Sequence, residues 1–303
     1  MTLPEILQTV RRVEIRTRRL ATDTMVGAYL SQFKGRGLDF EELRDYMPGD
    51  DVRDIDWNVT RRMGRPFIKR YREERELTVV LAVDISASSD FGSCRCSKRE
   101  FASEVAATLA FSAARNSDKV ALLLFTDRIE LFLPPRKGRK HLLRIIREML
   151  CFAPTSGNTR IPAALAGLNR LLHRRSIVFL LTDFLHSFTA GAGAATAPGR
   201  GTIQEIGITN ARHDVVCVHL LDPRERELPR AGLLVLEDAE TGELLEVDAG
   251  RAPIREAYAR SNAARAAALD QALRQAGVHT LRLTSGQPFA AALQAFFETR
   301  HRR

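Results

Sequence analysis

The spacing of apolar residues changes along the chain and divides it into three parts. Residues 1–33 place Ile6, Leu7, Val10 and Val13 at helical intervals, which predicts an amphipathic, Arg-rich helix. Residues 34–76 are rich in Gly, Pro and alternating charge, which predicts a compact irregular module with short strands near residues 67–71. From Leu77 to the C-terminus, residues 77–303, strand and helix patterns alternate.

The alternation in residues 77–303 predicts the fold class. Short aliphatic runs predict strands within 77–86, 119–125, 128–133, 176–182, 214–220 and 279–284. Longer periodic segments predict helices at 98–116, 139–150, 161–173, 203–210, 253–276 and 288–299, the fifth closed by Gly277. A Gly/Ala/Thr-rich stretch predicts a flexible loop at 187–202, and residues 233–248 predict a hairpin around Thr241-Gly242. We therefore expect an α/β fold with a doubly wound, mostly parallel sheet and a smaller irregular N-terminal module.

Composition narrows the class of protein. With 303 residues and 45% hydrophobic residues, the chain can bury a sizeable core. Its longest apolar runs are strand-length and its N-terminus lacks an apolar signal core, so we expect a cytoplasmic protein without a membrane span. Four cysteines in so long a chain argue against a disulfide scaffold, and the Cys94-x-Cys96 spacing is too tight for a usual zinc knuckle.

The positive charge is concentrated in one stretch. Residues 136–175 hold ten Lys or Arg and one acid, Glu148, a balance that equals the net charge of +9 for the whole chain. Such a stretch could bind nucleic acid or an acidic protein surface, but its charges follow helical spacing and are typical of solvated helix faces. Phe152 is the one Phe, Tyr or Trp among them, so the stretch lacks the interleaved aromatic residues that stack on bases.

The end of the first strand in residues 77–303 carries the candidate chemistry. Asp84, Ser86 and Ser88 form an Asp-x-Ser-x-Ser turn that directs one carboxylate and two hydroxyls toward one point. Alone, this pattern is more often a turn or a helix cap than a site. Two later junctions on the same edge of the predicted sheet add Thr159 and Asp183, and such oxygen ligands suit Mg²⁺.

In sequence order and position, Asp84, Ser86, Ser88, Thr159 and Asp183 resemble the metal-ion-dependent adhesion site of von Willebrand factor A domains. The resemblance implies that the two serines bind the metal directly, the threonine directly or through water, and the two aspartates mostly through water. It implies Mg²⁺, with Mn²⁺ or Ca²⁺ as alternatives, and a sixth position left for a carboxylate of a protein partner. Arg160 departs from the acidic residue expected after the threonine, which makes the outer charge of the site less negative.

The segment from Gly37 to Glu76 resembles the signature of bacterial DUF58 proteins. This resemblance implies an adaptor that works with MoxR-type AAA ATPases. Physically, the acids and arginines of the segment favour an ion network anchored by Trp57 as an aromatic plug: Asp50, Asp51, Arg53, Asp54, Asp56, Arg61 and Arg62. A second metal site stays open, although the spacing lacks the central Gly and terminal Glu of a calcium loop.

These observations predict a non-enzymatic, metal-dependent protein-interaction module whose partner is a MoxR-type ATPase or its client. A metal-dependent hydrolase is one alternative, but Ser86 stands where a phosphatase needs a second carboxylate, and the chain has no Walker lysine loop. Nucleic-acid binding through residues 136–175 is the other alternative, and it predicts an affinity that falls steeply with salt.

Overall fold

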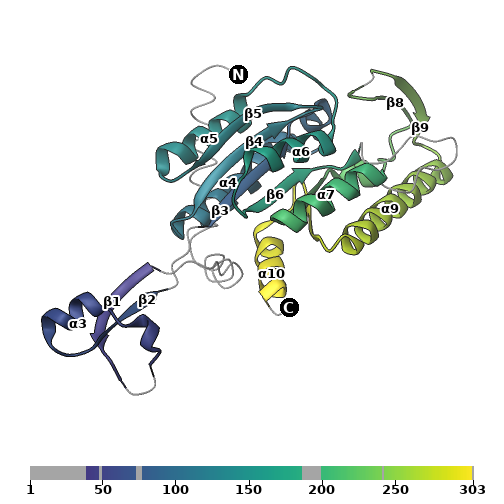
Figure 1. Cartoon of the computed structure of the whole chain (residues 1–303). Helices are drawn as coiled ribbons and strands as arrows, with labels where there is room; N and C mark the ends of the chain where they lie inside the picture. Colours follow the sequence, from purple (N-terminus) through teal and green to yellow (C-terminus); the bar gives the residue numbers. More distant parts are fainter. Residues whose placement is uncertain (1–38, 48–49, 73–76, 186–198, 241, 302–303) are drawn as a thin grey trace. The chain divides into compact units, whose positions relative to one another are not determined.

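The described residues form two compact units, one within residues 33–77 and the other within residues 78–303. The computed structural model describes residues 39–47, 50–72, 77–185, 199–240 and 242–301 (Figure 1). The helix predicted in residues 1–33 lies outside the described residues, and the two units are described separately.

The smaller unit is a two-stranded sheet with one short helix. Strands β1 (Asp39–Asp45) and β2 (Phe67–Arg72) pair antiparallel, which confirms the strand predicted near residues 67–71. Helix α3 (Trp57–Met63) lies between them in sequence. The Asp56 side chain caps this helix by accepting the backbone N–H groups of Asn58 and Val59, and Gly64 ends it in the left-handed region at φ 70°.

Trp57 is not an aromatic plug, so that prediction is wrong. Its side chain is 66% exposed within the described residues, and Phe67 and Ile68 are the buried hydrophobic residues of this unit. Two further acids of the segment bond to backbone N–H groups. Asp51 accepts the N–H of Arg53, and Asp50 accepts the N–H of Met47 while pairing with Arg44 at 2.7 Å. Short acidic side chains next to helical turns cap them at lower cost than they pair with long arginines.

The larger unit is built on one six-stranded sheet with the order β10-β7-β6-β3-β4-β5. All neighbouring strands run parallel except the edge pair β4 and β5. The predicted fold class, α/β with a doubly wound and mostly parallel sheet, is therefore confirmed. The six strands are β3 (Thr78–Asp84), β4 (Lys119–Phe125), β5 (Ile129–Arg136), β6 (Ile177–Thr182), β7 (Asp214–Leu221) and β10 (His279–Thr284).

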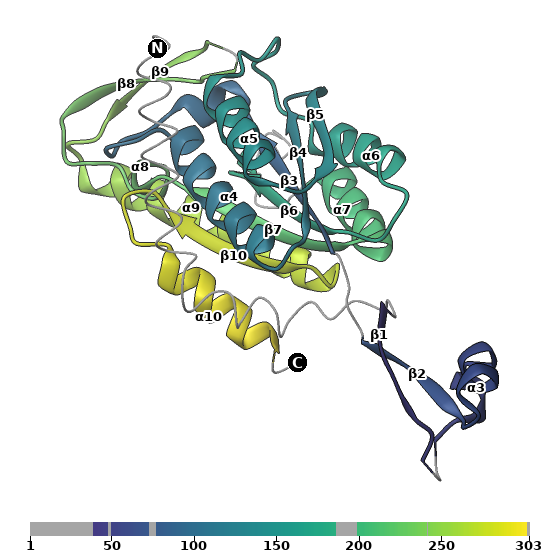
Figure 2. The ribbon, with the colours of Figure 1, turned by 90° about the vertical axis from the view of Figure 1, so that its left-hand side faces the viewer.

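Helices cover both faces of this sheet (Figures 1 and 2). One layer holds α4 (Lys98–Arg115), α5 (Arg139–Cys151) and α10 (Ala290–His301). The opposite layer holds α6 (Ile161–Leu171), α7 (Arg200–Arg212) and α9 (Ala252–Gln275). A single turn of helix, α8 (Pro223–Arg226), follows β7. The central strands are thus buried on both sides, which is why their sequences are continuous aliphatic runs.

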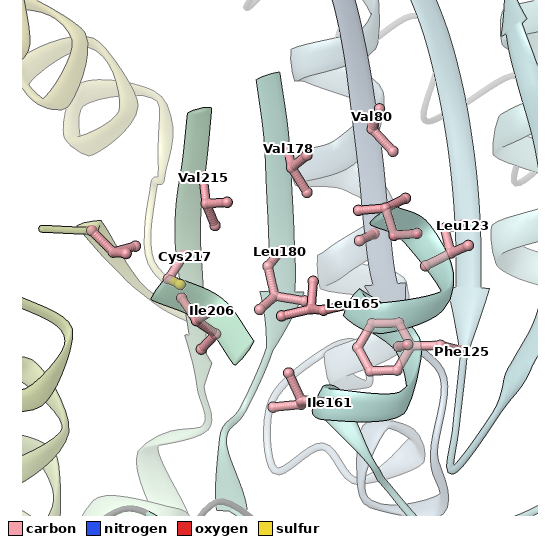
Figure 3. Packing of buried hydrophobic residues seen from close by; sticks show 14 of the residues in the cluster. Val80, Leu123, Phe125, Ile161, Leu165, Val178, Leu180, Ile206, Val215 and Cys217 are labelled. Atoms are coloured by element: carbon pink, nitrogen blue, oxygen red, sulfur yellow. The ribbon is translucent and has the colours of Figure 1, made fainter. Parts of the chain in front are cut away.

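The core lies between the sheet and these two layers. Figure 3 shows the cluster under α6 and α7, where Leu165 and Ile206 pack against alternate residues of the central strands, Val80, Leu123, Val178 and Val215. On the opposite face Phe179 of β6 meets Phe297 of α10 edge to face, with ring centroids 6.4 Å apart. Apolar packing on both faces thus holds the sheet in place. The carboxyl ends of the paired strands β3 and β6 lie side by side.

Helix α7 and the predicted hairpin can be compared directly with the predicted elements. Helix α7 begins at Arg200, three residues before its predicted start, so residues 200–202 belong to a helix and not to the predicted loop, whose residues 187–198 lie outside the described residues. The predicted hairpin is confirmed as β8 (Leu233–Glu237) and β9 (Leu244–Asp248), but it forms a separate two-stranded sheet. In the described part of the chain, no helix is both long and apolar enough to cross a membrane.

Candidate functional site

The loop after β3 holds three of the predicted site residues in a hydrogen-bonded turn. Asp84 ends the strand, and its Oδ1 accepts the N–H of Ser86 at 3.0 Å. The hydroxyl oxygens of Ser86 and Ser88 lie 3.2 Å apart. All three residues are buried. A strand that stops at a buried carboxylate therefore turns its next two hydroxyls toward the same small volume.

The end of the neighbouring strand β6 adds the fourth residue. Ser88 donates its hydroxyl to Oδ2 of Asp183 at 2.9 Å, and Thr182 donates to Oδ2 of Asp84 at 2.7 Å. These bonds cross the two central strands at their carboxyl ends, where the chain's connections diverge to the two sides of the sheet. Open α/β sheets bind ligands at this point.

A strained residue follows Asp183. Phe184 has φ 57°, a left-handed conformation that a bulky side chain adopts only when its surroundings hold it there. Its ring is buried and packs edge to face on His219 at 5.5 Å. The turn lets Oδ1 of Asp183 accept the N–H of Leu185 at 3.1 Å. Packing around Phe184 thus fixes the carboxylate of Asp183 at the sheet edge.

The loop that carries Thr159 is docked on the β3 loop through its backbone. Ala87, between the two serines, donates its N–H to the carbonyl of Gly157 at 2.9 Å, and Arg160 donates its N–H to the carbonyl of Thr126 at 3.0 Å. The Thr159 hydroxyl donates to Glu240 of the hairpin turn at 3.2 Å. In the described chain, the loop of Thr159 joins the site, whereas its hydroxyl bonds outside the cluster formed by the other four residues.

A buried lysine, absent from the predicted site, is part of this cluster. Lys98 begins α4 and is 2% exposed. Its ammonium lies 2.6 Å from Oδ2 of Asp183 and also bonds to Glu225 of α8. A buried cation is stable only when opposite charges surround it, and here two carboxylates do so.

Lys98 makes the two aspartates electrostatically unequal. Burial, and then the charge of Asp183, raises the pKa of Asp84 to about 6. Burial also acts to raise the pKa of Asp183, but the charge and hydrogen bond of Lys98 outweigh it and lower that pKa. Burial opposes the charge of Lys98, yet Asp183 and Glu225 outweigh it and raise the lysine pKa. Asp183 is therefore the member of the pair that stays ionised beside a cation, whereas Asp84 has no ion-pair partner among the described residues.

Sequence patterns gave at most weak indications of four further residues at the site: Lys98, Thr182, Glu225 and Glu240. A lysine in the first turn of a helix opposes the helix dipole, which is a local sign that an acidic partner compensates it. Thr182 stands directly before Asp183, but its bond to Asp84 depends on the pairing of β3 with β6. Glu225 and Glu240 come from elements distant in sequence, and no local pattern marks them.

A zinc-type site does not form in the described residues. No three His, Cys, Asp or Glu side chains in that part of the chain gather closely enough to hold a metal ion. Cys94 and Cys96, the spacing considered above, form no disulfide in that part of the chain; Cys94 is exposed, Cys96 is half-buried, and Cys217 is buried in the core. A metal at the edge of the sheet would thus be held by hydroxyls together with carboxylates.

Sequence comparison finds a family and bacterial relatives. The model of the family described as "Protein of unknown function DUF58" matches residues 42–268. A protein of Mycobacterium tuberculosis described as uncharacterised is 31% identical over 301 residues, which are 99% of this chain and 91% of the relative. A second uncharacterised protein, from Mycobacterium avium, is 29% identical over 172 residues, 56% of this chain and 94% of its own length.

Two solved structures align with this chain at low sequence identity. BatB from Bacteroides thetaiotaomicron has 14% identity and a TM-score of 0.47, over 75% of this chain and 100% of that one. The VWA domain of SpRpn10 has 11% identity and a TM-score of 0.39, over 72% of this chain and 94% of that one.

Proposed function

Because the chain belongs to the DUF58 family, we propose that its von Willebrand A-like domain is a non-enzymatic interaction module that holds one Mg²⁺ and receives an acidic side chain of a protein partner. The observation that carries the proposal is the pair of serine hydroxyls, 3.2 Å apart, backed by two carboxylates at the switch point of the sheet. Mn²⁺ and Ca²⁺ are the alternative ions.

The donor set fits a hard divalent ion. In a Mg²⁺ octahedron with bonds of about 2.1 Å, neighbouring oxygens lie about 3 Å apart. The separation of the Ser86 and Ser88 oxygens is close to this edge. The carboxylates of Asp84 and Asp183 already accept hydrogen bonds, so each orients a hydroxyl and reaches an ion through water more readily than directly.

Charge at the site supports the need for an acidic partner. Lys98 neutralises Asp183, and Arg160 stands in the outer loop, so few negative charges remain to satisfy a divalent ion. When bound, the metal supplies an electrophilic position for an incoming carboxylate. An ion with neutral serine ligands gains more from that carboxylate than one already surrounded by anions.

The protonation states speak against hydrolysis. A lysine acts as a general base only when its pKa is lowered, and that of Lys98 is raised. Ser88 donates its hydroxyl to Asp183, whose lowered pKa makes it a weak base. Ser88 therefore has no activating base among its described partners, and binding rather than bond cleavage suits its chemistry.

The family resemblance supports the partner class. We infer that the acidic ligand comes from a MoxR-type AAA ATPase or its client in the cytoplasm. The basic stretch 136–175 is the alternative contact surface; its residues Arg139, Lys140, Arg144 and Arg147 lie exposed along α5. Charged residues on the outer face of an amphipathic helix are expected in any case, so they favour neither nucleic acid nor protein.

Calorimetric titration with Mg²⁺ and Mn²⁺ tests the metal site. We expect the native chain to bind one ion, and both Asp84→Ala and the double change Ser86→Ala/Ser88→Ala to abolish binding because they remove ligands or the carboxylate that orients them. Ser89→Ala is the matched control, since this neighbouring hydroxyl donates to the carbonyl of Ser86 and not to a site side chain. Absence of binding by the native chain at millimolar metal, or equal binding by all variants, would overturn the proposal.

A further inference from the structure

The hairpin formed by β8 and β9 reaches the candidate site although it lies outside the main sheet. Its two strands pair only with each other in the described chain. Apolar side chains on it are 60–68% exposed: Leu233, Val235, Leu244 and Leu245. A two-stranded hairpin with uncovered faces has little stability of its own. Its position is therefore easier to change than that of the strands in the core.

The turn of this hairpin is built to present one carboxylate. Asp238 accepts the N–H of Glu240 on its side chain at 2.9 Å and the N–H of Gly242 on its carbonyl at 2.8 Å. Gly242 has φ 71°, the left-handed conformation that closes the turn. These bonds fix the backbone of Glu240 at the tip.

At the tip, Glu240 accepts the hydroxyl of Thr159 at 3.2 Å, across 81 positions of sequence. Thr159 is the predicted ligand whose hydroxyl bonds outside the other four, and its loop is joined to the serine loop by the backbone bond between Ala87 and Gly157. A carboxylate of the chain itself thus bonds to one predicted ligand of the site, for which the proposed function requires a carboxylate from a partner.

We propose that Glu240 is an in-chain ligand that competes with the partner's acidic side chain for the ion. The inference rests on the proposed metal-binding function. A carboxylate tethered on a short hairpin has a high effective concentration at the site, so a free acid must displace it before binding. Ser86 and Ser88 are 0% and 7% exposed, which fits a closed form of the site. Movement of the hairpin away from the Thr159 loop would open the site.

Acetate binding to the Mn²⁺-loaded chain tests this competition. The methyl proton line of acetate broadens when the anion reaches protein-bound Mn²⁺, and an excess of protein keeps free Mn²⁺ low. If the closed form holds nine-tenths of the molecules, Glu240→Gln strengthens acetate binding about tenfold. Glu246→Gln removes the same charge from an exposed position on the same hairpin and should leave acetate binding at the native value.

Water exchange on the ion supplies a second readout. Release of Glu240 frees a coordination position, so Glu240→Gln should raise the water proton relaxation caused by bound Mn²⁺, whereas Glu246→Gln should not. Native-like acetate binding in Glu240→Gln, with Mn²⁺ still bound, would overturn the competition and leave the metal site standing; Glu240 would then only orient Thr159. Failure of the native chain to bind Mn²⁺ would overturn this inference and the proposed function together.

Discussion

The charged side chains at the edge of the sheet differ in their environments. Asp84 and Asp183 are only a few bonds apart through Ser88 and Ser86, yet their pKa values move in opposite directions because Lys98 contacts one and not the other. Lys98 also bonds to Glu225, so one ammonium ties the start of α4 to β6 and α8. This lysine is therefore a structural cation at the base of the proposed metal site.

Replacing Lys98 should destabilise the fold strongly. Lys98→Met keeps most of the side-chain volume but leaves Asp183 and Glu225 without their cation, which should cost about 3–5 kcal/mol of unfolding free energy. Urea unfolding measures the loss. Because the lysine pKa is raised in the folded state, its contribution is present at all pH values below the unfolded pKa and is lost only as the pH rises through the folded one.

A second variant separates charge from packing. Lys98→Met/Glu225→Gln removes one of the two stranded charges, so it should lose less stability than Lys98→Met alone. Arg144→Met, at an exposed position of α5, is the control and should change little. Equal losses in the single and double variants would contradict the electrostatic role and assign the cost to packing.

At the scale of elements, the ends of strands and helices place the site. The parallel pairing of β3 with β6 sets Asp84 beside Thr182. A capping box starts α4: the Ser97 hydroxyl accepts the N–H of Glu100 at 3.2 Å, and the Glu100 carboxylate accepts the N–H of Ser97 at 3.3 Å. This box sets the register of the helix, and with it the position of Lys98.

The two glycines Gly277 and Gly207 should respond oppositely to the same substitution. Gly277 follows α9 at φ 69°, so Gly277→Ala should cost about 1–2 kcal/mol through backbone strain, although an added Cβ would meet only an ordinary contact with the Asn210 amide at 4.0 Å. Gly207 lies inside α7 with no atom within 4 Å of an added Cβ, so Gly207→Ala should gain up to about 1 kcal/mol. Thermal unfolding measures both variants; a loss at Gly207 would contradict the helix-propensity argument, and no loss at Gly277 would contradict the helix-end argument.

At the scale of the whole molecule, the proposed site couples metal binding to folding. Its residues come from segments that meet only when β3, β6 and the loop before α6 are assembled, so an unfolded chain has no such site. A ligand that binds only the folded state raises the free energy of unfolding by mass action. Metal binding should therefore be detectable as an increase in the free energy of unfolding.

Mg²⁺ should therefore stabilise the chain against heat. At a free Mg²⁺ concentration ten times its dissociation constant, the gain is about 1.4 kcal/mol. A thermal melt with Mg²⁺, repeated after addition of a chelator, should show a rise in Tm that the chelator reverses. Ser86→Ala/Ser88→Ala should show no such rise. An equal rise in this variant would mean that Mg²⁺ acts elsewhere on the protein.

Local sequence patterns were enough to predict the α/β class, nearly all strands and helices of residues 77–303, and the Asp84-x-Ser86-x-Ser88 turn with Asp183 at the neighbouring strand end. These features depend on local periodicity and on the rule that parallel strands share an edge, both visible along the chain. Trp57 shows the limit, because its exposure depends on how β1 and β2 pack, which no local pattern records.

Which charges and hydroxyls meet is visible only in the folded chain. Lys98 and Glu225 are brought to Asp183, and Glu240 is brought to Thr159, by elements far apart in sequence. Burial and pairing energies depend on three-dimensional neighbours, whereas a sequence pattern records only neighbours along the chain. The ligands of the proposed site were thus visible in the sequence, but the cation beneath it and the carboxylate across from it were settled by the fold.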